Sequence, residues 1–171
     1  MFKRSVLAVA ALAGALTACA PVPGPSPYPA APATFNTADF AWSQQPGRAA
    51  IDGRIAFNLR GETYNCTGSV VLTPDTPYTR QRFNTLYGSV NRAAIPEPIV
   101  RARNVPDPNA DYRSFVRQER CTDNRFRIAD LPNGNWFLIA TVSSTVSSGA
   151  ERIVLMRRVE TRGGRTISVT L

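Results

Sequence analysis

The side chains that could do chemistry in this chain are carboxylates, thiols and guanidinium groups, because the 171-residue sequence contains no histidine. Histidine is the commonest general base and a frequent metal ligand, so other groups would have to fill both roles. Acidic residues are scattered through the domain, among them Asp52, Glu62, Asp75, Asp107, Asp111, Glu119, Asp123 and Asp130. Because separation in sequence does not report separation in space, a glycosidase-like pair of carboxylates stays an open alternative.

The N-terminus has the layout of a secretory signal. Lys3 and Arg4 precede an apolar run at residues 6–16, about half of the roughly 20 residues that a bilayer-spanning helix needs. The residues Leu16-Thr17-Ala18-Cys19 that follow resemble the lipobox of bacterial lipoproteins. The resemblance implies cleavage before Cys19, a thioether-linked diacylglycerol on its sulfur and a third acyl chain on the new amine. An ordinary signal peptide with a cysteine near its cleavage site is the alternative.

A proline-rich segment at residues 20–34 follows the predicted lipid anchor. Its six prolines exclude helix and favour extended polyproline II, which at about 3.1 Å per residue reaches roughly 45 Å. We interpret it as a solvated spacer, and a ligand for a proline-binding groove is the alternative. Ala20 stands where an aspartate would argue for inner-membrane retention, so the lipoprotein resemblance implies the outer membrane.

The two remaining cysteines, Cys66 and Cys121, would both enter an oxidising compartment with the exported chain. Such a pair is most simply a disulfide. Closing a loop of about 55 residues would stabilise the fold by roughly 4 kcal/mol in the chain-entropy model. A catalytic thiol has little support, because the sequence offers neither a histidine partner nor a CxxC spacing. A metal site has little support either, because the sequence has no histidine and no acidic cluster.

Arginine supplies nearly all the positive charge. Lys3 is the only lysine, and removal of Lys3 and Arg4 with the signal lowers the formal net charge from +8 to +6. The arginines could reflect codon usage, or they could bind carboxylate and phosphate groups bidentately. A candidate patch for an anionic partner, with Tyr112 and Phe115 between its members, comprises Arg101, Arg103, Arg113, Arg117, Arg120, Arg125 and Arg127. A solvated polar face is the alternative.

Alternating apolar residues predict short strands through the domain. Residues 49–59 and 63–72 each show the period of two of a half-buried strand, with Cys66 on the apolar face and Pro74 ending the second strand. Thr76-Pro77 predicts the start of a short helix that ends near Gly88. Residues 92–110, rich in proline, are expected to be a long ordered loop or an edge segment, and residues 111–120 to hold one strand.

Two hairpins are predicted in the last third of the chain. Asn133-Gly134 lies between the alternating residues 125–131 and 136–142, and this dipeptide favours a tight turn. Residues 152–160 and 165–171 would form the second hairpin around Gly163-Gly164, with Ile167, Val169 and Leu171 facing inward. About six or seven short strands with almost no helix predict an all-β sandwich.

Several motifs resemble carboxypeptidase regulatory-like (transthyretin-like) domains. They are Asp52-Gly53-Arg54-Ile55, the run from Gly68 to Pro74, Thr122-Asp123 with Phe126, and Asp130-Leu131-Pro132-Asn133-Gly134-Asn135-Trp136. The resemblance covers residues 51–171, with a long insertion between Thr76 and Cys121. It implies a single Greek-key β-sandwich of about seven strands that serves mostly as an accessory or binding module. Relatives that hydrolyse 5-hydroxyisourate rely on histidines and a C-terminal Tyr-Arg-Gly-Ser motif, which this chain lacks.

Together these features predict a non-catalytic outer-membrane lipoprotein. Its parts would be a signal peptide (1–18), a lipidated cysteine with its tether (19–34), a lead-in segment of uncertain structure (35–50) and the sandwich domain (51–171). The predicted role is interaction with a protein partner in the cell envelope. Binding of an anionic glycan or lipopolysaccharide through the arginines is the alternative, and a carbohydrate-active enzyme is a distant one. No cofactor, metal or nucleic-acid partner is predicted.

Overall fold

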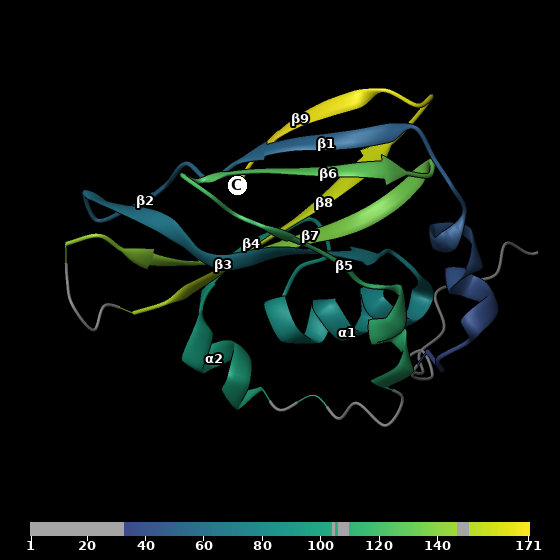
Figure 1. Cartoon of the computed structure of the whole chain (residues 1–171). Coiled ribbons are helices and arrows are strands. Elements are labelled where there is room, and N and C mark those ends of the chain that lie inside the picture. Colours follow the sequence, from purple (N-terminus) through teal and green to yellow (C-terminus); the bar gives the residue numbers. More distant parts are fainter. Residues whose placement is uncertain (1–32, 104, 106–109, 147–150) are drawn as a thin grey trace, which may run out of the picture. The chain divides into compact units, whose positions relative to one another are not determined.

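The structure is a computed structural model that describes residues 33–103, 105, 110–146 and 151–171. The predicted signal peptide, the acylated Cys19 and nearly all of the tether lie outside the described residues. Nine strands within the described part form two sheets that pack face to face (Figure 1), which confirms the predicted all-β sandwich with two strands more than expected.

Each sheet combines strands that are distant in sequence. Sheet A has the order β6 (Arg125–Leu131), β1 (Ala49–Arg54), β9 (Thr166–Thr170). Sheet B has the order β2 (Phe57–Leu59), β3 (Glu62–Pro74), β7 (Gly134–Ser144), β8 (Ile153–Thr161), β4 (Arg92–Pro96). A short strand, β5 (Arg117–Arg120), also pairs with β3, beyond β2 on the same strand edge. In sheet A, β1 runs antiparallel to β6 and parallel to β9.

The main core lies between the two sheets. Ile51 and Phe126 reach into it from sheet A, and Leu72, Trp136 and Leu138 reach into it from sheet B. None of these five side chains is more than 6% exposed. Burying a side chain of this size stabilises a fold by about 1.5–3 kcal/mol, so the two facing apolar surfaces hold the sheets together.

Helices cover the other face of sheet B, although the sequence predicted almost no helix in the domain. Figure 1 shows α1 (Pro77–Tyr87) and α2 (Glu97–Ala102) on the side of sheet B away from sheet A. The ring of Phe83 in α1 packs edge-on against Phe137 of β7, with ring centroids 4.9 Å apart. A second apolar cluster thereby forms on the outer face of sheet B.

The predicted start and end of α1 are confirmed. The Thr76 hydroxyl accepts a hydrogen bond from the Thr79 N–H, and the Thr79 hydroxyl accepts one from the Thr76 N–H, which completes a capping box. Pro77 occupies the first turn, where its missing N–H costs nothing. Gly88 ends the helix in the left-handed conformation, with φ of 68°.

Both predicted hairpins are wrong, because each joins strands of different sheets. Asn133-Gly134 connects β6 of sheet A to β7 of sheet B, and Gly163-Gly164 connects β8 of sheet B to β9 of sheet A. β7 is already paired along both of its edges, with β3 and β8, so it has no free edge for β6. The buried Thr161 hydroxyl holds the first connection by donating to the Pro132 carbonyl oxygen (2.7 Å).

The first predicted strand is also divided between the sheets. β1 ends at Arg54, and β2 begins at Phe57 in sheet B. The link between them is fixed by two hydrogen bonds, from the Ile55 N–H to the Asn124 carbonyl oxygen and from the Ala56 N–H to the Leu171 carbonyl oxygen, each 2.8 Å long.

The lead-in segment packs on the domain as the 3₁₀ helix η1 (Thr37–Gln44). Phe40 is fully buried, and the ring of Trp42 lies 4.7 Å from that of Trp136. The region 92–120, expected to be loop or edge with one strand, contains β4 at the sheet edge, α2, a 3₁₀ helix η2 (Ala110–Phe115) and β5. The predicted edge segment and single strand are therefore present, and the helices were missed.

Candidate functional site

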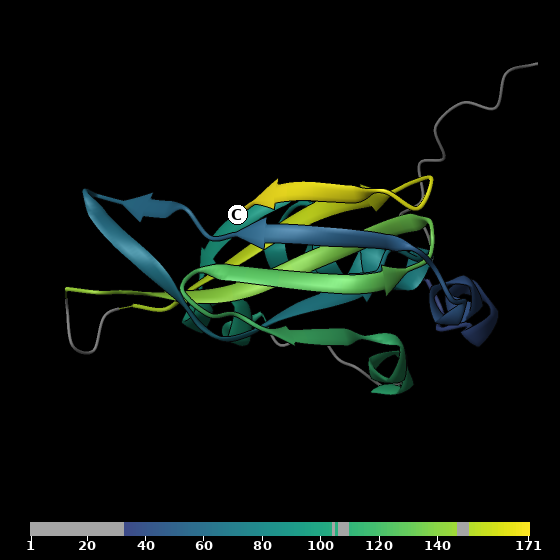
Figure 2. The same cartoon turned by 45° about the horizontal axis from the view of Figure 1, so that its top comes forward.

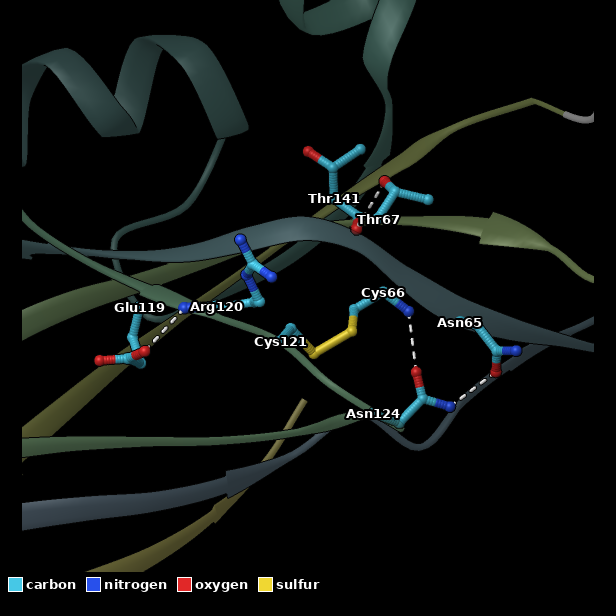
Figure 3. Close-up of a disulfide and its surroundings, with 8 residues drawn as sticks. All are labelled: Asn65, Cys66, Thr67, Glu119, Arg120, Cys121, Asn124 and Thr141. Carbon is cyan, nitrogen blue, oxygen red and sulfur yellow. Dashed lines mark hydrogen bonds between the residues drawn. A yellow bond between two sulfur atoms is a disulfide. The ribbon is translucent and has the colours of Figure 1, made fainter.

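The turn between β5 and β6 is tied to β3 by the predicted disulfide. Cys66 of β3 and Cys121 are joined, with their Cα atoms 6.4 Å apart (Figure 3). Asp123 and Asn124, the two central residues of the turn, both have positive φ, at 50° and 59°. This is the geometry of a type I′ turn, which Asp and Asn tolerate better than most residues.

Asn124 joins this turn to two other parts of the sandwich. Its side-chain oxygen accepts the N–H of Cys66 (2.8 Å), and its side-chain nitrogen donates to Oδ1 of Asn65 (2.6 Å), as Figure 3 shows. Its backbone oxygen accepts the N–H of Ile55 at the end of β1. The turn is therefore attached to β3 by the disulfide and the Asn124 side chain, and to β1 by the Asn124 backbone.

β5 and β6 separate beyond the turn because each joins a different sheet. Thr122 and Arg125 exchange both backbone hydrogen bonds at the turn, at 2.8 and 2.9 Å. Past this point β5 pairs with β3 and β6 pairs with β1 (Figure 2). An open hollow of about 620 Å³ lies along them, lined by Asp52, Gly53, Glu119, Arg120, Thr122, Arg125, Phe126 and Arg127.

A second, smaller hollow of about 180 Å³ adjoins the first on the outer face of sheet A. It is lined by Asp52, Gly53, Arg54, Arg125, Ser168, Val169 and Thr170, so the two hollows share Asp52, Gly53 and Arg125. The outward side chains of β6, β1 and β9 here are all polar. We call these outward residues, Asp52, Arg54, Arg125, Arg127, Ser168 and Thr170, the sheet A face.

Among the described residues, two guanidinium groups of the sheet A face have no carboxylate partner. Arg54 and Arg125 are directly opposite on β1 and β6. Arg54 donates only to the Thr170 hydroxyl (3.1 Å), and within the described residues neither arginine forms an ion pair. The neighbouring cross-strand pair is neutralised, because Arg127 contacts Asp52 at 2.6 Å. Like charges directly opposite destabilise a sheet, so this position favours a bound anion.

Of the seven arginines in the predicted patch, only Arg125 and Arg127 belong to the sheet A face, and three others come from the region of α2 and η2. Arg101 pairs with Glu97 within α2 (2.6 Å), and Arg103 donates to the Leu86 carbonyl oxygen at the end of α1. Both lie with the helices that cover sheet B. Arg113 is on η2.

Arg117 has a structural role at the far end of β5. Its guanidinium group donates to the carbonyl oxygens of Ser43 (3.0 Å) and Asp130 (3.1 Å), and it lies 5.9 Å from the ring centre of Trp136. It thereby links β5 to η1 and to the end of β6. Arg117 is not among the residues that line the hollow.

The last three arginines of the patch do border the hollow. Arg125 and Arg127 flank the buried Phe126 and point outward from β6, as the alternation predicted. Arg120 also lines the hollow, but Figure 3 shows its side chain on the opposite side of β5 from Glu119. The candidate anion site therefore consists of Arg125 and Arg127 from the predicted patch and Arg54 from β1.

Sequence reasoning did not place Arg54, Ser168 or Thr170 in a site, and it named Asp52 only among the scattered acidic residues. The alternation of residues 49–59 places Asp52 and Arg54 on the polar face of a predicted strand, which was the available signal. Ser168 and Thr170 could not be placed beside them, because β9 was expected to pair with β8 rather than to run parallel to β1.

Two carboxylates, Asp52 and Glu119, line the larger hollow, as a glycosidase would require. A general acid of that kind keeps its proton when it is buried in apolar surroundings. Asp52 is instead 47% exposed and paired with Arg127, and Glu119 is exposed and accepts the Arg120 N–H. Neither carboxylate is therefore buried in apolar surroundings, as such an acid would be.

The carboxylate of Asp75 is fully buried and is held by two arginines. The Asp75 side chain has no exposed surface and contacts Arg80 at 2.8 Å and Arg158 at 2.6 Å. The hydrogen bond to Asp75 also raises the pKa of Arg80. Asp75 joins the start of α1 to β8, and its oxygens are occupied within the protein, so we assign it a structural role.

Other kinds of site have less support. An apolar hollow of about 310 Å³ lined by Phe57, Arg92, Ala93, Ala94, Leu155, Met156 and Leu171 presents one charged side chain and no acid. Among the described residues, no three histidine, cysteine or acidic side chains are grouped as metal ligands. No helix in the same part of the chain combines the length and apolar character needed to cross a membrane.

The sequence matches no protein family and no curated protein. In structure, the chain is similar to a protein from Pseudomonas aeruginosa described as a putative carbohydrate binding protein. The two share 19% sequence identity and superpose with a TM-score of 0.55 over 80% of this chain and 97% of that chain. At this level of identity the similarity shows the β-sandwich fold alone.

Proposed function

We propose that this chain is a non-catalytic, lipid-anchored binding module of the cell envelope, which holds an acidic glycan on the sheet A face. The observation that carries the proposal is the pair of opposed guanidinium groups, Arg54 and Arg125, with no carboxylate partner in the described residues. A sugar acid would supply the missing carboxylate, and charge-assisted hydrogen bonds to arginine are about twice as strong as neutral ones.

Neighbouring polar groups suit the rest of such a ligand. The hydroxyls of Ser168 and Thr170 can donate or accept, and the Asp52 carboxylate can accept from sugar hydroxyls. The hollow exposes little aromatic surface, because its one aromatic lining residue, Phe126, is only 6% exposed. Recognition would therefore depend on charge and hydrogen bonds, and binding should weaken as salt screens the arginines.

The description of the Pseudomonas aeruginosa neighbour as a putative carbohydrate binding protein supports the choice of a glycan. The two-sheet architecture supports the proposed kinship with carboxypeptidase regulatory-like domains, whose members serve mostly as accessory or binding modules. For the anchor, the support is the Leu16-Thr17-Ala18-Cys19 motif, which implies acylated Cys19 and residence at the outer membrane. Mass analysis of the N-terminal peptide from native membranes tests this, and an unacylated Cys19 would contradict it.

Calorimetric titration tests the glycan proposal directly. The ligands are a tetramer of 1,4-linked galacturonic acid and, as a neutral control, the corresponding galactose tetramer. We expect Arg54→Gln and Arg125→Gln each to weaken binding of the acidic tetramer by roughly 10- to 100-fold, because a hydrogen bond to a charged group contributes about 1.5–3 kcal/mol. Arg101→Gln is the matched control, since Arg101 is an exposed arginine on α2. Equal binding of the neutral tetramer would contradict the proposal.

A carbohydrate-active enzyme is the second candidate, because Asp52 and Glu119 line the same hollow. It predicts that the chain releases new reducing ends from the acidic tetramer and that Asp52→Asn or Glu119→Gln abolishes this release. The non-catalytic proposal predicts that neither the unmodified chain nor these variants release new reducing ends. A protein partner is a third outcome: crosslinking in native membranes would then capture one stoichiometric protein, and Arg125→Gln would reduce its capture.

A further inference from the structure

The end of sheet A where Arg54 and Arg125 face each other needs support from outside the sheet. Arg54 is the last residue of β1 and Arg125 the first of β6, so both are at the end of their ladder. Their charges repel across the last pair of the β1–β6 ladder. The next residues on either side, Ile55 and Asn124, are joined by a hydrogen bond of 2.8 Å.

That support comes from β3, at a point where β3 itself is incompletely paired. β2 pairs with β3 only as far as Tyr64, and β5 pairs with it only from Ser69 onward. The pairing with β7 is also irregular between Cys66 and Val70. The turn fills this gap: Cys121 is bonded to Cys66 through sulfur, and its N–H donates to the Gly68 carbonyl oxygen (3.1 Å).

We propose that the Cys66–Cys121 disulfide and the Asn124 side chain are the positioning elements of the anion site, which hold Arg54 and Arg125 together against their mutual repulsion. The inference rests on the proposed function for its ligand, but it concerns how the site is built. Asn124 is suited to this role because its side chain reaches Asn65 and Cys66 while its backbone oxygen holds Ile55.

The site would therefore be complete only in the oxidised protein. When the disulfide forms, the two thiols lose two protons and two electrons to an oxidant such as an exported protein disulfide, which becomes a dithiol. The chain would bind its ligand weakly where its cysteines stay reduced and strongly after export. Dithiothreitol reverses the step in vitro: it returns two electrons and two protons to Cys66 and Cys121 and becomes a cyclic disulfide itself.

The experiment compares four forms of the full-length chain in detergent: oxidised, reduced with dithiothreitol, Cys66→Ser/Cys121→Ser, and oxidised Asn124→Gly. Glycine accepts the left-handed backbone of residue 124, so this variant removes the side-chain bonds without straining the turn. Asp123→Gly is the matched control, because Asp123 is in the same turn and its side chain has no hydrogen bond or ion pair within the described part of the chain.

Two readouts are measured: affinity for the galacturonic acid tetramer, and amide hydrogen exchange followed by NMR. We expect the reduced form, the Cys66→Ser/Cys121→Ser variant and the Asn124→Gly variant each to lose at least tenfold in affinity. The affinity of the Asp123→Gly control should be unchanged or slightly higher. The amides of Ile55 and Arg125 should exchange at least tenfold faster in the same three forms, while amides in the middle of β7 stay protected.

The two readouts separate the two proposals. If the oxidised chain does not bind the tetramer, the proposed function fails, and the exchange rates alone decide the positioning proposal. Unchanged exchange at Ile55 and Arg125 in oxidised Asn124→Gly, or an affinity within twofold of the oxidised chain, would overturn the positioning role. If the cysteine variant does not fold, the Asn124→Gly comparison still gives this decision.

Discussion

Removal of the disulfide should lower the stability of the sandwich by an amount that follows from the length of the loop it closes. Cys66 and Cys121 are 55 residues apart in sequence. In the chain-entropy model, a loop of this length restricts the unfolded chain by about 4 kcal/mol at 25 °C. For a folded unit of about 140 residues, with an unfolding entropy of roughly 2 cal/mol/K per residue, this corresponds to a fall in Tm of about 10–15 °C.

Thermal and urea unfolding of the oxidised chain and of Cys66→Ala/Cys121→Ala, followed by circular dichroism, measures the difference. The oxidised chain reduced with dithiothreitol is the control and should unfold close to the variant. A fall in Tm of less than about 3 °C would refute the reasoning, because it would mean that the bond hardly restricts the unfolded chain. A variant that loses its cooperative transition would show instead that the turn and β5 depend on the bond for folding.

Three further outcomes follow from single side chains. Gly53→Ala should destabilise the fold by about 1–3 kcal/mol, because its Cβ would lie 1.8 Å from Cζ of Phe126; an unchanged urea midpoint would contradict this. Arg117→Ala should cost about 1–3 kcal/mol, because it leaves the part-buried Ser43 carbonyl oxygen without its charged donor. Arg101→Ala, at an exposed ion pair, should cost less than about 0.5 kcal/mol in the same urea experiment. Burial raises the pKa of Tyr87 to about 12, so its contribution to stability is complete below pH 10 and is lost between pH 10 and 12. Over that range the unfolding free energy should fall by about 2–3 kcal/mol more in the wild-type chain than in Tyr87→Phe, and parallel curves would argue against it.

Local alternation predicted which side chains face the core, because that choice depends on residues two apart in one strand. The apolar face of β3, the inward Val169 of β9 and the buried Leu171 that follows it were found in this way. The capping residues of α1 are equally local. Pairing partners were not predictable, because they depend on which edges the rest of the chain leaves free. The Asn133-Gly134 dipeptide predicted a turn. It could not indicate that β7 pairs with β3 and β8 along both of its edges.

The candidate site shows the same division. Arg125 and Arg127 were correctly expected to point outward together, since they flank Phe126 in one strand. Arg54 comes from β1, some 70 residues before Arg125 in the chain. Thr170 comes from β9, which runs parallel to β1 and lies at the C-terminal end of the chain. The role of Arg117 was hidden for a different reason: its charge suggests a surface residue, whereas its bonds to two backbone oxygens depend on η1 and β6.

The most direct test of the account is an NMR titration of the oxidised chain with the galacturonic acid tetramer, in which the Arg Nε–H signals and backbone amides are followed. The account predicts that the side-chain signals of Arg54 and Arg125 shift together, with the amides of Ser168 and Thr170, and that 0.5 M salt suppresses the shifts. Shifts centred on the apolar hollow that Phe57, Ala93 and Leu155 help to line, or no shifts at millimolar ligand, would contradict it.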